Sequence, residues 1–326
     1  MRRAVLAVVV VLLIGPIDTD AQPAGGTHRI GVIPGTDRVD GAPLVEALKE
    51  GLRSLGYLEG QNVVFEYRWR ETGVAVDHDR FAADLVRLKV EVIVVGTGRA
   101  ALAAKRATTT IPIVIAVSPD PVREGLVASL ARPGGNVTGL SFLSADLAPK
   151  QLELLKTAAP RVSRVAVLWT GAIPAHTVLL KEMERPARSL GITLHAVEAR
   201  TLDDLGGAFA SMGRHRANGL LVLPNSLWTA HQARLHELTA QHHLPAMYSV
   251  LSQAEGGGLM AYAADARDNW RRAAAYVDKI LRGAKPGDLP IEQPAKFTLV
   301  VNLKTARALG VTIPPALLLR ADRTIE

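Results

Sequence analysis

The stretch Val-Glu-Val-Ile-Val-Val-Gly-Thr-Gly-Arg-Ala-Ala, residues 90–101, decides the fold class of this chain. Its apolar run ends at Gly96, and an alanine-rich segment with helical character, residues 99–107, follows at once. A short, nearly continuous run of Val and Ile beside a helix is typical of a strand buried on both faces, as strands are in parallel sheets. The stretch therefore predicts one strand–helix unit of an α/β protein.

The same unit recurs on both sides of a glycine-rich segment, residues 134–139. Before it, strands are expected at 29–33, 63–69, 90–95 and 111–117, and helices at 41–55, 79–88, 99–107 and 122–131. From it onward, strands are expected at 137–142, 165–169, 193–199, 219–224 and 246–250, and helices at 149–158, 178–190, 202–212 and 229–242. Strands that alternate with helices in this way predict two doubly wound, Rossmann-like lobes, each with a parallel sheet.

The last third of the chain departs from this simple alternation. It is expected to contain a strand at 259–262, a helix at 268–281, a proline-rich linker, a strand at 297–302 and a helix at 304–309. This order predicts a return to the first lobe and a further crossing, so we expect lobe I at 28–139 plus 254–287 and lobe II at 140–253 plus 288–326. Three crossings beneath a ligand cleft suit a hinge that closes around a ligand.

Composition excludes several classes of protein. The chain has 326 residues, of which 48% are hydrophobic and 21% charged, and this balance excludes intrinsic disorder. It has no Cys, which excludes a disulfide scaffold, a thiolate metal site, a Cys nucleophile and a lipid-modified N-terminal Cys. The net charge of +7 comes from scattered residues without a basic stretch interleaved with aromatics, so no nucleic-acid partner is expected.

The first 21 residues have the features of an export signal. Arg2 and Arg3 precede an unbroken apolar run, residues 4–14, which Gly15 and Pro16 end. Small residues then lead to a cleavage point near Ala21. A helix over the apolar run would span only ~16 Å, about half of a bilayer core. Residues 1–21 therefore predict a cleaved signal peptide and a periplasmic location; a retained anchor or a cytosolic N-terminal helix is the alternative.

Ligands of parallel α/β sheets bind beyond the carboxyl ends of the strands, where loops and helix N-termini meet. Thr97 and Gly98 precede a helix and are candidates to bind a carboxylate, while Asp120 is a candidate to pair with an amine. Alternatively, Thr97 and Asp120 cap helices, and Trp169 and Trp228, which could stack on a flat ligand, fill the core. The complete set of candidate ligand-binding residues is Pro34, Gly35, Thr36, Thr97, Gly98, Ser118, Asp120, Thr170, Gly171, Asn225, Ser226 and Tyr262.

One motif favours a different function. Residues 96–101 satisfy the pattern G-x-G-x-x-A directly after a strand, and Asp120 follows near the end of the next strand. This is the dinucleotide-binding fingerprint, so an NAD(P)-dependent enzyme is the alternative hypothesis. Other catalytic patterns are absent from the sequence, and the spacing of His231 and His236 does not favour a metal site. We expect no catalytic residues, no metal and no cofactor.

Several stretches carry a family resemblance over nearly the whole chain after the export signal. They are LGYLEGQNV (55–63), EYRW (66–69), ATTTIPIV (107–114), LARPGGNVTG (130–139), EGGGLM (255–260), QPAKF (293–297) and NLKTA (302–306). In these motifs and their order the chain resembles the periplasmic solute-binding proteins of ABC transporters, of the tryptophan/tyrosine-type ABC_sub_bind family. Two loops differ from the family pattern: Gly98 stands where members often carry Ser, and Thr170-Gly171 replaces an Asn-Pro-rich turn.

The resemblance implies a type I periplasmic binding fold and a function without catalysis. It implies capture of a small molecule, an aromatic or related amino acid, by closure of two lobes. The implied partner is an ABC permease in the inner membrane, and the receptor is expected to be a monomer. A receptor that feeds a sensor instead of a transporter is the remaining alternative.

Overall fold

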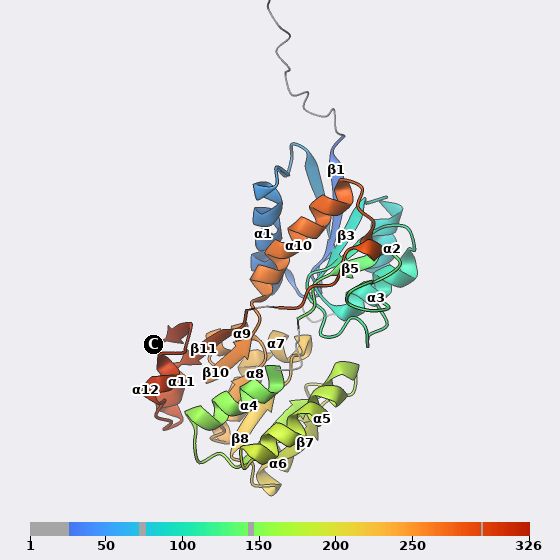
Figure 1. The fold of residues 1–326 in the computed structure, drawn as a ribbon. Helices are drawn as coiled ribbons and strands as arrows, with labels where there is room; N and C mark the ends of the chain where they lie inside the picture. The colour runs from blue at the N-terminus through green and yellow to red at the C-terminus, as the bar shows by residue number, and fades with distance from the viewer. Residues whose placement is uncertain (1–25, 72–75, 143–146, 295) are drawn as a thin grey trace, which may run out of the picture.

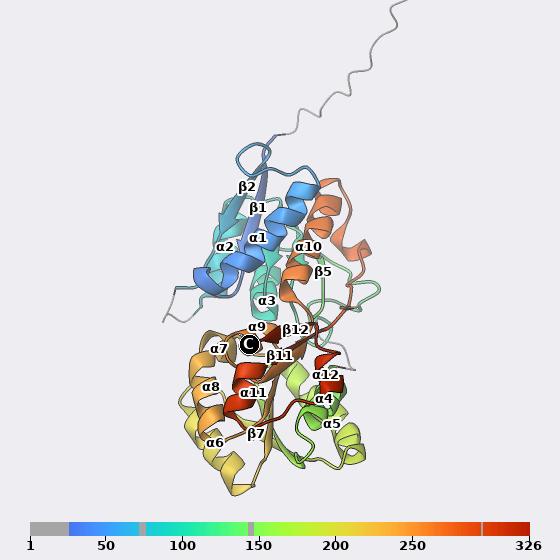
Figure 2. The same ribbon diagram turned by 90° about the vertical axis from the view of Figure 1, so that its left-hand side faces the viewer.

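The computed structural model describes residues 26–71, 76–142, 147–294 and 296–326, which form two β-sheets with their helices (Figure 1). We call the five-stranded sheet with its helices the first lobe and the seven-stranded sheet with its helices the second lobe. Figures 1 and 2 show the two lobes one above the other, with the connecting segments between them. The export signal expected at residues 1–21 lies outside the described residues.

The first lobe contains a fully parallel sheet with the strand order β2-β1-β3-β4-β5. Its strands are β1 (His28–Ile33), β2 (Val63–Tyr67), β3 (Val92–Val95), β4 (Ile113–Ile115) and β5 (Val137–Gly139). Its helices are α1 (Arg38–Ser54), α2 (His78–Arg87), α3 (Gly98–Ala107) and α10 (Ala266–Leu281). The two faces of the sheet pack on different helices.

Alternate side chains of strand β1 enter the two cores of the first lobe. Ile30 and Val32 of β1 belong to the core under α1 and α10, together with the fully buried Trp270 of α10. Ile33 belongs to the opposite core, with Leu85 of α2 and the alanines of α3. Because successive strand residues point to opposite faces, an all-apolar strand requires a helix layer on each side. The apolar runs of the sequence therefore predict this sandwich.

The second lobe repeats the strand order of the first and extends it. Its sheet runs β12-β11-β10-β9-β8-β6-β7, so the five strands from β7 to β10 repeat the order β2-β1-β3-β4-β5. Its strands are β6 (Arg164–Trp169), β7 (Thr193–Glu198), β8 (Gly219–Val222), β9 (Ala246–Tyr248), β10 (Met260–Ala263), β11 (Thr298–Asn302) and β12 (Arg323–Ile325). The added strand β11 is antiparallel to β10 and parallel to β12.

Eight α-helices of the second lobe surround this sheet in the described part of the chain. They are α4 (Leu147–Ala158), α5 (Pro174–Ser189), α6 (Asp204–Arg214), α7 (Ser226–Ala230), α8 (Gln232–Gln241), α9 (Leu251–Glu255), α11 (Leu303–Ala308) and α12 (Pro315–Leu318). The predicted fold class, two doubly wound α/β lobes, is confirmed. Among the described residues, no helix is long and apolar enough to cross a lipid bilayer.

The chain passes between the lobes three times, after β5, before α10 and after α10. The first and third connections run side by side: the Ser141 N–H donates to the Glu292 carbonyl at 2.9 Å, and the Glu292 N–H donates to the Gly139 carbonyl at 3.1 Å. The Asn269 amide of α10 donates to the Ser141 carbonyl at 3.2 Å, and Arg272 of α10 pairs with Glu292. All three connections are therefore linked in one hydrogen-bonded junction.

Residues 122–131, expected to be a helix, are instead a series of turns. Gly125 takes a left-handed conformation with φ +71°, so the backbone cannot continue as a right-handed helix there. The Lys105 ammonium holds the segment by donating to the carbonyls of Gly125 and Leu126 at 2.7 and 3.0 Å. The prediction of a helix at 122–131 is wrong because the segment is held by contacts to α3.

Strand β10 lies in the second lobe, whereas the sequence places residues 254–287, which include it, in the first lobe. β10 pairs with β9 and β11 in the second sheet, whereas α10 packs on α1 and the first sheet. The return to the first lobe therefore comes after β10.

The expected helix at 229–242 is also divided, into α7 and α8, because the backbone is non-helical at His231 with φ −121° and ψ 33°.

The close packing of α1 on α10 yields a stability prediction. A Cβ at Gly51 would lie 2.5 Å from the Arg271 carbonyl oxygen and 2.8 Å from Ala274 Cβ. Gly51→Val should therefore lower the free energy of unfolding by about 1–3 kcal/mol, as overpacking typically does. Urea unfolding measures the loss. Gly213→Ala is the control, because that helical glycine has no neighbouring atom within 4 Å and should be neutral or slightly stabilising. Equal stabilities of Gly51→Val and wild type would contradict the prediction.

Candidate functional site

The candidate site lies where the strand order of each sheet changes direction. With the order 2-1-3-4-5, the loops that follow the first and third strands leave the sheet on opposite sides and open a crevice at their carboxyl ends. In the first lobe these are the loops after β1 and β3, and in the second lobe the loops after β6 and β8. Most of the candidate residues from the sequence lie on these four loops.

The two loops of the first lobe touch each other. Gly35 has φ +79°, and a Cβ there would overlap the Thr97 side chain, so this position requires glycine. A Cβ at Gly96 would overlap the Pro34 carbonyl oxygen and would lie 2.7 Å from the Trp270 ring. The structure therefore brings the candidates Pro34, Gly35 and Thr97 together.

Thr97 acts as the N-cap of α3. Its Oγ1 accepts a hydrogen bond from the Ala100 N–H at 3.2 Å, and its backbone is extended. This is the capping alternative that the sequence left open for this residue. The helix beyond it begins at Gly98, where the N-terminal N–H groups lack helical partners.

Trp69, in the EYRW stretch, is a further candidate residue, which its place after a strand in the sequence does not single out. A Cβ at Gly41 would lie 2.5 Å from the Trp69 ring and 2.9 Å from Thr36 Cγ2, so the indole lies beside the loop after β1. Its ring stacks on Tyr67 with centroids 5.8 Å apart and planes at 25°. The indole keeps intermediate exposure. An aromatic face is thus available at the edge of the first-lobe loops.

The loop after β4 supplies two carboxylates near α3. The buried Ser118 hydroxyl donates to Glu124 Oε2 at 2.5 Å, and the Glu124 carboxylate fills the space that a side chain at Gly98 would occupy. Asp120 pairs with Arg123 at 3.0 Å and accepts the Arg123 N–H at 3.0 Å. Burial raises the pKa of Glu124, the hydrogen bond from Ser118 opposes this shift, and the Asp120 charge adds to it. The sequence gives no signal for Glu124, because its position depends on the turns of this loop.

In the second lobe, His176 connects the two candidate loops. The Thr170 N–H donates to His176 Nδ1 at 3.2 Å, and His176 Nε2 donates to the Pro224 carbonyl at 3.0 Å. This pattern requires the neutral imidazole with its proton on Nε2. His176 is completely buried, and burial lowers its pKa to about 4. His176 is therefore a positioning residue for the two loops, through contacts that depend on the tertiary fold.

The remaining second-lobe candidates have structural partners. The Gly171 N–H donates to Glu198 Oε1 at 3.1 Å, and Asn225 caps α7, which begins at Ser226, by accepting the Leu227 N–H at 2.8 Å. Trp228 is buried in the core, as the alternative interpretation holds, whereas Trp169 keeps intermediate exposure beside Gly171.

Tyr262 lies apart from the four loops. It belongs to β10, two strands away from β8, and its ring packs on Phe297 with centroids 5.6 Å apart. Its carbonyl accepts a hydrogen bond from Gln151 Nε2 at 2.7 Å. The structure therefore does not join Tyr262 to the other candidates.

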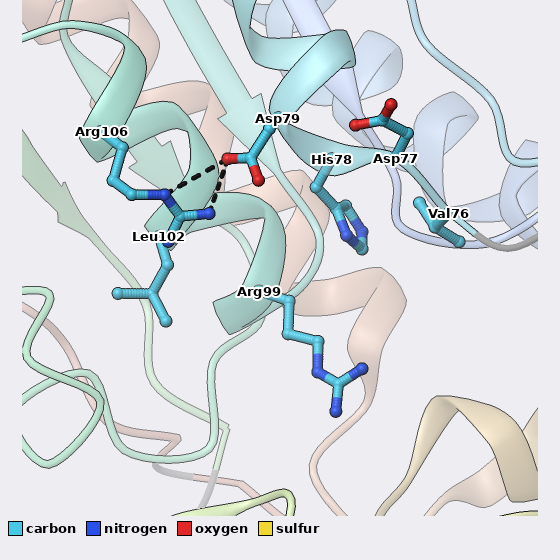
Figure 3. Close-up of a pocket in the computed structure, with 7 residues that line it drawn as sticks. All are labelled: Val76, Asp77, His78, Asp79, Arg99, Leu102 and Arg106. Atoms are coloured by element: carbon cyan, nitrogen blue, oxygen red, sulfur yellow. Dashed lines mark hydrogen bonds and ion pairs between the residues drawn. The ribbon is translucent and has the colours of Figure 1, made fainter.

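A groove of about 380 Å³ lies between the N-terminal end of α2 and the side of α3 that carries Arg99, Leu102 and Arg106 (Figure 3). Its wall contains the Asp79–Arg106 pair at 2.6 Å, and Arg99 extends away from that pair. Burial and the Arg99 charge lower the pKa of His78, which also lines the groove. Within the described ranges, no group of three or more His, Asp or Glu side chains is placed to hold a metal ion.

Comparison with solved structures identifies the class of protein. A crystal structure of a conserved domain protein from Vibrio cholerae O1 biovar El Tor is 29% identical, with a TM-score of 0.83 over 91% of this chain and 99% of that one. An ABC domain from Streptococcus pneumonia in complex with L-Trp is 24% identical, with a TM-score of 0.82 over 92% and 100% of the two chains. The fold is that of a type I periplasmic binding protein.

Sequence comparison identifies the family. The family model of the "ABC transporter substrate binding protein" matches residues 40–325, and the chain therefore belongs to this family. A relative from Clostridioides difficile (strain R20291), described as a tyrosine-binding protein, is 25% identical over 82% of this chain and 78% of its own length. The protein is thus a small-ligand-binding component of an ABC transporter, and substrate-binding proteins of this family work outside the cytoplasm.

Family membership excludes the alternative hypothesis of an NAD(P)-dependent enzyme, because the family consists of non-enzymatic substrate-binding proteins. The structure supplies a physical reason as well. The second glycine of a dinucleotide fingerprint lets the backbone approach a pyrophosphate. Here a carboxylate, that of Glu124, already lies against Gly98 and would repel such an anion.

The contacts of His176 predict a pH-dependent stability. His176→Phe leaves the Thr170 N–H and the Pro224 carbonyl unpaired in the core, which should lower the free energy of unfolding by about 2–5 kcal/mol. The folded-state pKa, about 4, lies below the ordinary histidine value of 6.5. The stabilisation from neutral His176 is thus complete above pH ~6.5 and is lost as the pH falls toward 4.

Urea unfolding at pH 7 and at pH 4.5 tests both statements. The stability difference between wild type and His176→Phe should shrink at pH 4.5. His231→Phe, at an exposed position, is the control and should leave the pH profile unchanged. A constant difference between wild type and His176→Phe at both pH values would contradict the assignment of a neutral imidazole.

Proposed function

We propose that this protein captures an aromatic or related amino acid between its two lobes and delivers it to a permease of an ABC importer in the inner membrane. The observation that carries the proposal is the repeated strand order, which gives each lobe a pair of loops at a switch point. A ligand held by both pairs would contact both lobes at once. Such a ligand favours the closed arrangement through its higher affinity for that state.

Two observations support the aromatic part of the proposal. The indole of Trp69 lies beside Thr36 on the first-lobe loops, and Trp169 lies beside Gly171 on the second. Flat ligands gain affinity from stacking on such rings. The printed names of similar proteins agree with this chemistry, since one is described as tyrosine-binding and another was solved with L-Trp.

The lobes can move because the junction between them is narrow. The first and third connections pair through two backbone hydrogen bonds between the segments at Gly139–Ser141 and Glu292, and α10 adds the contact of Asn269 with Ser141. A few residues at such a junction can absorb the rotation of a hinge. The receptor would act as a monomer in the periplasm after cleavage of residues 1–21.

A ligand panel tests the proposed function. We expect L-Trp, L-Tyr or L-Phe to bind with micromolar affinity and to raise the free energy of unfolding by about 3 kcal/mol at a concentration of 100 Kd. Isothermal titration calorimetry gives the affinity, and small-angle scattering should show a smaller radius of gyration with ligand. L-Leu, L-Glu and D-galactose are the comparison ligands. The absence of any response to amino acids would refute the ligand class.

The role of Trp69 can be tested separately. Trp69→Ala should raise the Kd of the aromatic ligand about tenfold or more, because a stacked ring contributes roughly 0.5–1.5 kcal/mol beyond its buried area. Val64→Ala is the matched control, since Val64 lies on β2, the strand that ends just before Trp69, and its side chain is exposed away from the loops. An unchanged Kd in Trp69→Ala, with an unchanged fold by circular dichroism, would remove Trp69 from the site.

A further inference from the structure

Glu124 is a largely enclosed carboxylate at the edge of the proposed ligand site. Its Oε2 accepts a hydrogen bond from the buried Ser118, and the carboxylate packs directly on Gly98 at the start of α3. Gly98 is adjacent to Thr97, whose side chain contacts Gly35 of the loop after β1. The carboxylate therefore lies beside the loops after β1 and β3, which form the first-lobe part of the proposed site.

No cationic side chain in the described part of the chain forms an ion pair with Glu124. The nearest basic residue in sequence, Arg123, pairs with Asp120 at 3.0 Å, and the Lys105 ammonium donates to two backbone carbonyls instead. The Asp120 carboxylate, a like charge, raises the pKa of Glu124 further instead of balancing its charge. A partly buried carboxylate without a cation is unfavourable, so it either takes up a proton or pairs with a positive charge from outside the protein.

A ligand can reach Glu124, because the side chain keeps intermediate exposure. The same carboxylate makes this place unsuitable for a ligand carboxylate. The N-terminus of a helix ordinarily attracts anions, but at α3 a protein carboxylate already lies against the first residue, Gly98. A second carboxylate there would meet a like charge.

We propose that Glu124 is a specificity-determining residue that binds the protonated amine of the ligand at the Gly98 edge of the first lobe. The inference rests on the proposed function and adds the orientation of the ligand: the ammonium group points to α3, and any carboxylate of the ligand lies away from it. This assigns to Glu124 the amine-binding role that the sequence suggested for Asp120, whose oxygens are occupied by Arg123. It also predicts that amines without a carboxylate bind.

Titration calorimetry with three classes of probe tests the proposal. The probes are amino acids (L-Trp, L-Tyr), amines without a carboxylate (tryptamine, tyramine, cadaverine) and carboxylates without an amine (indole-3-propionate, 4-hydroxyphenylpropionate). Wild type should bind the amines and the amino acids, and the carboxylates at least tenfold more weakly. Glu124→Gln keeps the size of the side chain, and it should weaken the binding of every amine-bearing probe at least tenfold while leaving the carboxylates unchanged or improved.

Glu237→Gln is the matched control, because Glu237 is a surface carboxylate of α8 paired with Arg234. It should bind all probes as wild type does. A second variant, Gly98→Ser combined with Glu124→Ala, creates room for a hydroxyl at α3 and should shift the preference toward the carboxylates. Urea unfolding of each variant separates a loss of fold from a loss of affinity.

The outcomes distinguish this inference from the proposed function. If L-Trp or L-Tyr binds wild type and Glu124→Gln equally well, Glu124 does not select the amine, while the proposed function stands. If cadaverine binds in a Glu124-dependent way and the aromatic probes do not, the inference stands and the aromatic ligand class fails. If no amine-bearing probe binds wild type, both are overturned.

Discussion

The position of Gly139 is the constraint on which the relation of the two lobes depends. Its φ of +130° is rarely adopted by residues with a side chain, and a Cβ there would overlap the backbone of Ile115 on the neighbouring strand. The chain can therefore leave the first sheet only through a glycine, pressed against β4. The Gly139 carbonyl then accepts the Glu292 N–H, so the exit of the first connection also fixes the third. The backbone pairing therefore ties the first and third connections together where the chain leaves the first sheet.

The two lobes on either side of this junction share one strand order. The order β2-β1-β3-β4-β5 recurs as β7-β6-β8-β9-β10, so each lobe obtains its crevice from topology rather than from a special sequence. The details that hold the loops differ. In the first lobe, glycines allow the loops to touch, with Gly35 against Thr97; in the second, the buried imidazole of His176 joins Thr170 to Pro224. A buried neutral histidine resists protonation, so this link between the second-lobe loops persists until the pH falls toward 4.

The fold was largely predictable because its strands are short apolar runs that only a doubly covered sheet can bury. The run Val92–Val95 and its flanking glycine already specify a strand–helix unit. The failures come where tertiary contacts decide. Residues 122–131 have apolar residues at helical spacing, yet they form turns, because Gly125 is left-handed and its carbonyl is held by Lys105. β10 belongs to the second sheet because it pairs with β9 and β11. The local hydrophobic pattern of a strand does not show which strands it pairs with.

The candidate site was predictable as a set of loops but not as a set of contacts. Helix positions and strand ends locate Thr97 and Asp120, but the sequence does not show that their polar groups serve a cap and an ion pair. Nor does it show why residue 98 is glycine. A residue with a side chain at that position would displace the carboxylate of Glu124, and a carboxylate at Glu124 excludes such a residue in turn. Gly98 and Glu124 thus form one unit, 26 positions apart in sequence, because the carboxylate of one occupies the space beside the other.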